Sequence, residues 1–171
     1  NTSERTGGAA VASRRLKDAL NNNGVKAKML VAHKESGDIT VVEMPGKIRQ
    51  RIHFLWERWC IFCHLHFHRD HLFELDMANA GTDITSLPEF READIIHLEW
   101  INQGMLSLGS IRKILHSGKP VVWTMHDLWP ATGICHVTLG CKAYLEGCHH
   151  CKYLPHHHGK KDVATRIFNR K

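Results

Sequence analysis

PVVWTMHDLWP, residues 120–130, is the stretch that decides the fold of this chain. Its first half, Val121 to Thr124, is short, apolar and rich in β-branched residues, so it predicts a buried strand. Its second half places His126 and Asp127 at the carboxyl end of that strand. Because ligands bind at that end in open α/β sheets, the stretch predicts a parallel sheet and one edge of a binding site.

The rest of the chain alternates between strands and helices. We expect strands at residues 25–31 and 93–98, and either a strand or the arm of a hairpin at residues 39–43. We expect helices at residues 9–20, 47–62, 106–116 and 161–171. Such alternation is typical of parallel β-α-β units, and a chain of 171 residues fits one domain. We therefore predict a single α/β domain over residues 1–171, with a cysteine-rich loop at residues 131–159.

A glycine pair opens the first helix. Gly7 and Gly8 precede apolar residues at helical spacing, and Gly24 provides a stop. Glycines let a ligand approach the backbone, and a helix amino terminus favours an anion, so the pair is a candidate substrate-binding element. Loops of this kind usually follow a strand, and none precedes this one. We therefore expect that the first strand is missing and that the sequence is a fragment or lacks its natural start.

Four cysteines follow the deciding stretch in the pattern Cys-x5-Cys-x6-Cys-x2-Cys: Cys135, Cys141, Cys148 and Cys151. Zinc prefers four soft ligands in a tetrahedron, and a Cys-x2-Cys turn supplies two of them on one knuckle. We predict a structural zinc ion, because four thiolates leave no open position for catalysis. Free cysteines and two disulfides are the alternatives. Three nearby histidines are spare ligands: His136, His149 and His150.

The composition is that of a basic globular protein. Hydrophobic residues make up 43% and charged residues 23%, both ordinary values. The formal net charge of +6 favours anionic partners such as nucleotides, phospholipid headgroups or nucleic acid. The sequence shows neither a run of 18 apolar residues nor a charged-then-apolar leader, so we expect a cytoplasmic location.

The helix expected at residues 47–62 is basic and amphipathic. Six side chains share one side of it: Ile48, Ile52, Leu55, Trp56, Trp59 and Cys63. Two interpretations are open. The mixture of Trp and Phe with Arg and Lys suits an anionic membrane surface, which would make the protein peripheral at the inner face of a membrane. Alternatively, the apolar side packs on the sheet.

Polar residues follow two of the expected strands. His126 and Asp127 come after residues 121–124, and His97 and Glu99 stand in the same way at the end of residues 93–98. Carboxyl ends of parallel strands meet at one edge of a sheet, so these groups can act together on a phosphate or a sugar hydroxyl. The alternative is that they only cap the turns that follow.

Three ordered segments resemble the amino-terminal half of bacterial glycosyltransferases of the family 4 type: residues 6–10, 93–104 and 118–130. The cysteine loop after the His-Asp-x-Trp-Pro motif is similar to that of a subgroup often found with polysaccharide biosynthesis. The resemblance implies the GT-B architecture, in which two Rossmann-like domains face each other across a cleft. This chain would be the acceptor-side domain, a parallel sheet with helices on both faces.

The same resemblance implies retaining transfer of a sugar from a nucleotide-sugar donor to a saccharide or lipid-linked acceptor, usually without a catalytic metal. His126 would approach the transferred sugar, Asp127 would support it, and the glycine pair would lie near the donor phosphates or the acceptor. His97 is carried over as substrate-binding, whereas Glu99 is not, because relatives often have histidine there. The carboxyl-terminal domain with its paired glutamates is absent, so we expect the chain alone to be inactive.

A second interpretation is a zinc-stabilised module that binds nucleic acid or a protein partner without enzyme activity. The basic charge and the cysteine loop favour it. However, no helix with spaced Arg and Lys follows the cysteines, and aromatic residues are sparse among the basic ones. We therefore expect no nucleic-acid partner.

Overall fold

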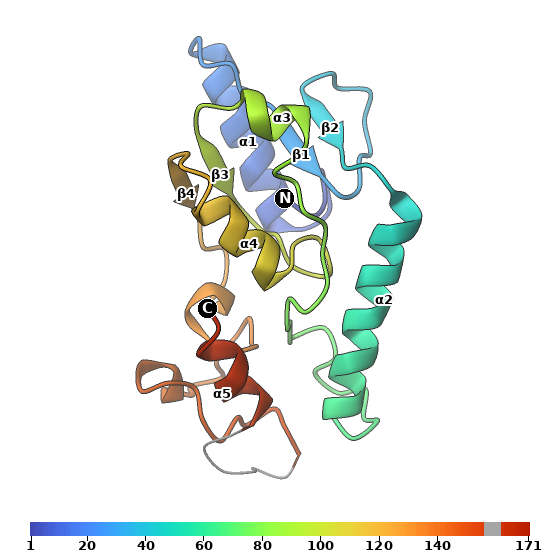
Figure 1. Cartoon of the computed structure of the whole chain (residues 1–171), viewed down its shortest axis with the longest axis vertical. Coiled ribbons are helices and arrows are strands. Elements are labelled where there is room, and N and C mark those ends of the chain that lie inside the picture. Colours follow the sequence, from blue (N-terminus) through green and yellow to red (C-terminus); the bar gives the residue numbers. More distant parts are fainter. Residues whose placement is uncertain (156–161) are drawn as a thin grey trace.

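The computed structural model describes residues 1–155 and 162–171 (Figure 1). Its helices are α1 (Gly8–Asn22), α2 (Lys47–His64), α3 (Pro88–Glu92), α4 (Leu108–Leu115) and α5 (Val163–Phe168). Its strands are β1 (Met29–Val31), β2 (Val41–Glu43), β3 (Ile96–Leu98) and β4 (Val121–Trp123), and short 3-10 helices are η1 (Trp129–Ala131) and η2 (Ala143–Leu145). Lys161, the expected start of the last helix, lies outside the described residues.

The strands pair in parallel, which confirms the α/β class. β1 pairs with β2 in the register Met29 to Val41, and β3 pairs with β4 in the register Ile96 to Val121. Within the described residues these are two separate two-stranded sheets rather than one continuous sheet. The arrangement is compatible with half of a Rossmann-like fold but does not form its full sheet. The hairpin alternative for residues 39–43 is wrong, because β2 runs parallel to β1.

The first three residues join the two strand pairs at their carboxyl ends. The Thr2 N–H donates to the Trp100 carbonyl, just after β3, at 2.7 Å. The Thr2 carbonyl accepts from the Ala32 N–H, just after β1, at 3.0 Å. The backbone before the glycine pair thus runs between the ends of β1 and β3, which brings the turn into α1 to the edge where both strands end.

The strand after α1, β1, is shorter than the sequence predicts, because it begins at Met29 rather than at Val25. The Asn21 side chain, near the end of α1, accepts from the Ala27 N–H and donates to the Ala27 carbonyl, both at 3.0 Å. Residues ahead of Met29 are therefore tied back to α1 and do not pair with β2. In the view of Figure 1, α1 runs between the two strand pairs, and α3 and α4 lie in front of it.

Buried apolar side chains form a main cluster around the strands and a second cluster below it. Ile96, Leu98 and Ile114 belong to the main cluster, and Ile61 and Leu75 belong to the second. The second cluster also takes in α5 and part of the cysteine loop. Leu108 of α4 packs against both clusters, and a third, small cluster of Met29, Val31 and Val41 lies on β1 and β2.

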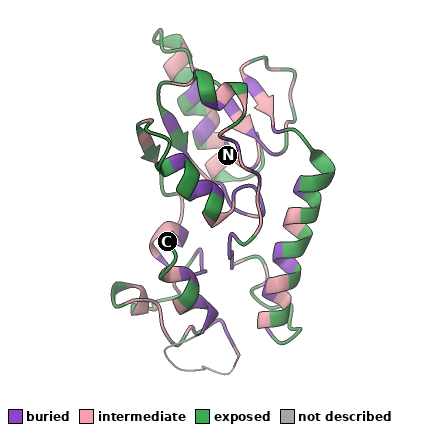
Figure 2. Ribbon diagram, in the orientation of Figure 1, coloured by how far each residue is buried: buried purple, intermediate pink, exposed green. Residues whose placement is uncertain are grey.

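The packing of α2 differs most from expectation. Its buried residues are Gln50, Glu57, Arg58 and Ile61, so a mostly polar face points inward. The Glu57 carboxylate accepts from the Met77 and Ala78 N–H groups at 3.1 and 2.6 Å, and Arg58 donates to the Leu72 carbonyl at 2.6 Å. These backbone groups are buried without strand partners, and the polar face of α2 satisfies them. The interpretation that the apolar side packs on the sheet is wrong, since that side is exposed (Figure 2).

A close backbone contact holds α2 in place. Gly104 has φ +77°, and a methyl group there would lie 2.6 Å from the Phe54 nitrogen. Only glycine permits this conformation and this approach together.

None of the helices in residues 1–155 and 162–171 combines the length and the apolar character needed to cross a bilayer.

Candidate functional site

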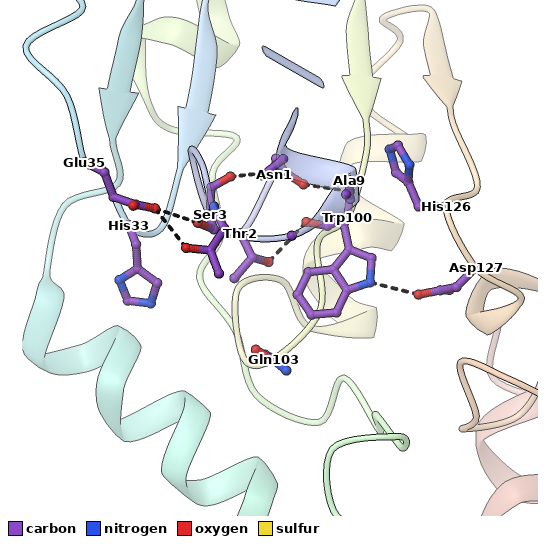
Figure 3. A pocket seen from close by; sticks show the side chains of 14 residues that line it. Asn1, Thr2, Ser3, Ala9, His33, Glu35, Trp100, Gln103, His126 and Asp127 are labelled. Carbon is purple, nitrogen blue, oxygen red and sulfur yellow. Dashed lines mark hydrogen bonds between the residues drawn. The ribbon is translucent and has the colours of Figure 1, made fainter. Parts of the chain in front are cut away.

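A cavity of about 690 Å³ opens where the strands end (Figure 3). The first residues, the turn into α1 and the segments after β1, β3 and β4 all contribute to its wall. Four of the residues expected from the sequence line it together: Gly7, Gly8, His126 and Asp127. His97, also expected there, does not line the cavity. The structure thus brings the glycine turn and the residues after β4 to one place, and His97 lies beside them.

The glycine turn presents backbone to the cavity. Gly7 has φ +90° and ψ 163°, a conformation that side-chain-bearing residues rarely adopt. No side chain caps α1, and its first turn contains no acidic residue. A Cβ on Gly8 would meet nothing within 4 Å, so the helix amino terminus is open to a ligand. Such a terminus carries a partial positive charge and suits an anion.

His126 is held by a carboxylate that the sequence interpretation left out. Its Nε2 lies 2.5 Å from Glu99 Oε2, and both side chains are largely buried. His97 lies at the far oxygen of the same carboxylate, with Nε2 3.4 Å from Glu99 Oε1, and bonds to the Thr124 hydroxyl at 2.7 Å. Glu99 therefore joins the two strand exits. It fixes the His126 ring, so the ring can act as an oriented hydrogen-bonding group.

Asp127 has a different set of partners. Its carboxylate accepts from Trp100 Nε1 at 2.8 Å, from His136 Nδ1 at 2.7 Å and from the Trp129 N–H at 2.9 Å. Burial raises the pKa of Asp127, but the bonds from His136, Trp129 and Trp100 outweigh burial and hold the pKa below its usual value. Asp127 is thus a stable anion that positions the Trp100 ring on the cavity wall. The support expected for His126 comes from Glu99 instead.

Glu35 lies across the cavity from His126 (Figure 3). It accepts from the Ser3 and Thr6 hydroxyls at 2.9 and 3.3 Å and from the Arg5 N–H at 3.3 Å. The Ser3 bond is the main reason why the pKa of Glu35 is lowered. This carboxylate therefore fixes the loop that leads into the glycine turn. We call the side chains of Glu35, Glu99, His126 and Asp127 the rim.

The cavity wall includes residues that were not predicted from the sequence, among them His33, Glu35 and Trp100. His33 and Trp100 stand within two residues of a strand end, which is the signal that indicates His126 as well. Glu99 is indicated by the same signal, but the resemblance gives it no role, because relatives often have histidine there.

The four cysteines lie in one region but do not form a ready metal site. Burial raises the pKa of Cys135, Cys148 and Cys151, and in each case another of the four cysteines raises it further. The Cys148 sulfur accepts from the Gly133 N–H at 3.0 Å, a bond that favours a thiolate. Yet among the described residues no three His, Cys, Asp or Glu side chains are grouped so that they could hold a metal ion. The zinc ion stays a prediction from the spacing.

Comparison with known proteins gives one similarity that bears on function. No family model matches the chain, and no solved structure gives a significant match. A stretch of 73 residues, 41% of this chain, is 33% identical to a protein of Escherichia coli (strain K12) named "Putative colanic acid biosynthesis glycosyl transferase WcaC". The matched stretch covers 18% of that protein, less than a fifth of its length. The similarity supports a relationship to glycosyltransferases.

Proposed function

We propose that this chain is the acceptor-side domain of a retaining glycosyltransferase that uses a nucleotide-sugar donor. The observation that carries the proposal is that the glycine turn and His126 line the same cavity. The partial similarity to a protein named as a glycosyl transferase supports the reaction class. The acceptor is a saccharide or a lipid-linked saccharide, and a second domain supplies most contacts to the donor.

The glycine turn acts on negative charge. Gly7 and Gly8 expose the amino terminus of α1 to the cavity, and neither would place a Cβ against another atom. As the glycosidic bond forms, the nucleoside diphosphate leaves with a growing negative charge. Backbone N–H groups that already point at this charge stabilise it without reorganisation.

His126 acts by hydrogen bonding rather than as a nucleophile. Its Nε2 is bound to Glu99, so the remaining ring nitrogen is the one that meets a ligand. An imidazole fixed in this way bonds to a hydroxyl of the transferred sugar and sets the direction from which the acceptor approaches. Orientation of this kind contributes a large part of the rate in two-substrate reactions.

Asp127 and Glu99 are positioning residues. Asp127 holds the Trp100 ring, whose flat face suits the apolar face of a sugar, and Glu99 holds the His126 ring. Closure of the second domain over this wall would expel water and bring acceptor, donor and leaving group together. The chain alone would not complete the reaction.

The test is sugar transfer by the complete gene product with a panel of uridine and guanosine diphosphate sugars. We expect His126→Ala to lower turnover about 100-fold or more and Gly8→Val to act similarly, because both remove positioning in the cavity. Gly37→Val is the matched control, since Gly37 also has open space around its Cβ position and lies outside the cavity wall. Equal activity of the His126 variant and the control would refute the proposal.

A further inference from the structure

Much of α2 is exposed (Figure 2), and its outward face carries large apolar side chains. Five large side chains, each between 54% and 79% exposed, form what we call the α2 stripe: Ile48, Ile52, Leu55, Trp56 and Trp59. At 100° per residue they fall within an arc of about 100° on the helix. The stripe continues past the helix end, because Phe62 contacts Trp59 at 6.0 Å and Phe67 at 5.4 Å between ring centroids, and Phe67 is exposed.

The stripe is not a by-product of a loosely packed helix. The opposite face of α2 is buried and bonded to the backbone of residues 72–78. Gly104 fixes the helix by direct backbone contact. The orientation of α2 is therefore determined, and it turns two tryptophans and three aliphatic side chains to solvent. Monomeric proteins rarely expose apolar surface of this kind unless it meets something.

The charges around the stripe indicate what it meets. Arg49 and Arg51 are exposed and fall on opposite sides of the stripe, whereas Lys47, exposed in the first turn, is paired with Glu43 at 2.9 Å. The single carboxylate of α2, Glu57, is fully buried on the inner face. The outward face thus combines apolar and cationic groups with no exposed acid. An apolar stripe flanked by arginines, with tryptophan rings at its centre, is typical of a helix that lies in an anionic lipid interface.

One of the two flanking arginines also reaches toward the candidate site. Arg51 lines a second cavity of about 360 Å³, whereas the five α2 stripe residues do not. Thr2, His33 and Gln103 line both this cavity and the larger one. Arg51 is therefore the group that connects the outward face of α2 with the candidate site.

We propose that α2 docks this protein on an anionic lipid surface, with the α2 stripe inserted at headgroup level and the flanking arginines on lipid phosphates. The proposal rests on the exposed face of α2 and does not depend on the reaction proposed for the cavity. A second copy of the chain, or another protein segment, would cover the stripe without requiring anionic lipid.

The experiment measures binding of the chain to phosphatidylcholine vesicles with and without phosphatidylglycerol, by sedimentation and by tryptophan fluorescence. We expect binding only when phosphatidylglycerol is present, together with a blue shift and quenching by lipids brominated in the upper acyl chain. Trp56→Phe with Trp59→Phe should remove most of the quenching, because the other three tryptophans lie outside α2.

Two double variants separate charge from insertion. Arg49→Gln with Arg51→Gln should weaken binding about 30-fold, since each basic group near an anionic surface contributes a factor of about five. Trp56→Ser with Trp59→Ser should weaken it roughly tenfold or more. The matched control is Arg15→Gln with Lys26→Gln, which removes the same charge from exposed positions away from α2. All these positions are exposed, so circular dichroism should show an unchanged fold.

Three results would overturn the proposal. The first is binding that does not depend on phosphatidylglycerol, or no binding at all. The second is equal weakening by the control pair, which would mean that net charge alone drives adsorption. The third is a dimer in sedimentation velocity that Trp56→Ser with Trp59→Ser converts to a monomer, which would assign the stripe to a second copy.

Discussion

The rim and the cysteine region shift the pKa values of their acidic groups in opposite directions. The cysteine region comprises residues 131–155 and 162–171. At the rim, hydrogen-bond donors surround Glu35 and Asp127 and hold the pKa of each below its usual value. In the cysteine region, burial raises the pKa of the Cys135, Cys148 and Cys151 thiols, and neighbouring thiols add to the effect. The rim holds its carboxylates as anions as it stands, whereas in the cysteine region burial outweighs the positive charge of Lys171, which lowers the pKa of the Cys148 thiol.

This difference indicates which region keeps its geometry without a bound cation. A carboxylate with three donors is stable as an anion, so the rim keeps its geometry without any further component. Buried thiols that raise each other's pKa remain protonated unless a cation joins them.

Metal analysis addresses the cysteine region. We expect one zinc ion per chain, lost in Cys148→Ser but kept in the control Cys60→Ser, which lies on α2 outside the loop. Structural zinc contributes about 10–16 kcal/mol in small peptides at neutral pH, so chelation should disorder the cysteine region while the strands persist. Amide NMR would show both outcomes in one sample. A metal-free chain with two disulfides would contradict the prediction, because the cysteine region would then need no cation.

Trp129 contacts both regions, which are also joined by the bond between His136 and Asp127. Its N–H donates to Asp127 at the rim, its Nε1 donates to the Asp76 carbonyl at 2.8 Å, and its ring lies 3.5 Å from Lys171 Nζ at the end of the chain. The side chain is fully buried. Trp129→Ala should therefore cost about 3–5 kcal/mol of unfolding free energy, measured by urea titration. Trp123→Ala, on a partly exposed ring, is the control and should cost less.

Asp127→Ala tests whether the rim depends on charge. It leaves the Trp100, His136 and Trp129 donors without their acceptor, which should cost about 1–3 kcal/mol. The native pKa of Asp127 is lowered, so its contribution is present above the unfolded pKa near 3.8 and is lost as pH falls through the lower native value. The difference between variant and parent should therefore shrink in acid. A difference that stays constant with pH would mean that the carboxylate charge contributes nothing.

Glu57→Gln should change the stability of the protein in the opposite direction from Asp127→Ala, and by a smaller amount. Burial, followed by the nearby Asp76 charge, raises the pKa of Glu57 well above its usual value, so the native state holds it protonated. Its stabilising effect is full below the unfolded pKa near 4.5 and declines as pH rises above that value. A neutral glutamine keeps an oxygen for the Met77 and Ala78 N–H groups, so we expect it to stabilise the protein by about 1 kcal/mol at mildly alkaline pH. Thermal unfolding across pH checks this, and a loss of stability at every pH would show that Glu57 is needed as an anion.

The sequence predicted which residues lie at the strand ends better than it predicted the packing. Residues 120–130 indicated a buried parallel strand with a binding edge. The structure has β4 ending at a cavity lined by His126 and Asp127, but the burial was predicted wrongly, since Val121 and Trp123 are half-buried and Val122 is exposed. A strand followed by polar residues can be recognised in a short stretch of sequence. In a parallel sheet the direction of the chain then determines the edge at which those residues lie. The sequence placed Glu99 and His126 at the ends of neighbouring strands but did not indicate that the two side chains contact each other.

The orientation of α2 shows why the remainder could not be predicted. The bounds of the helix were close to those observed, at Lys47–His64, and its apolar side was identified correctly. Amphipathicity states which residues share a face but not which face is turned to the body. That choice was made by unpaired backbone groups in residues 72–78, which need the carboxylate of Glu57 and the guanidinium of Arg58. Which backbone groups lack a partner can be seen only in the folded structure.

The measurement that bears most directly on the cavity is a chemical-shift titration of isotope-labelled chain with uridine and guanosine diphosphate sugars and with pyrophosphate. If the turn into α1 and the imidazole after β4 form one ligand site, the amides of Gly7 and Gly8 and the ring of His126 will shift together, with one dissociation constant, and Gly8→Val will abolish the shifts while Gly37→Val preserves them. Shifts confined to α2 or to the cysteine region, or separate constants for the two halves of the cavity wall, would contradict a single site.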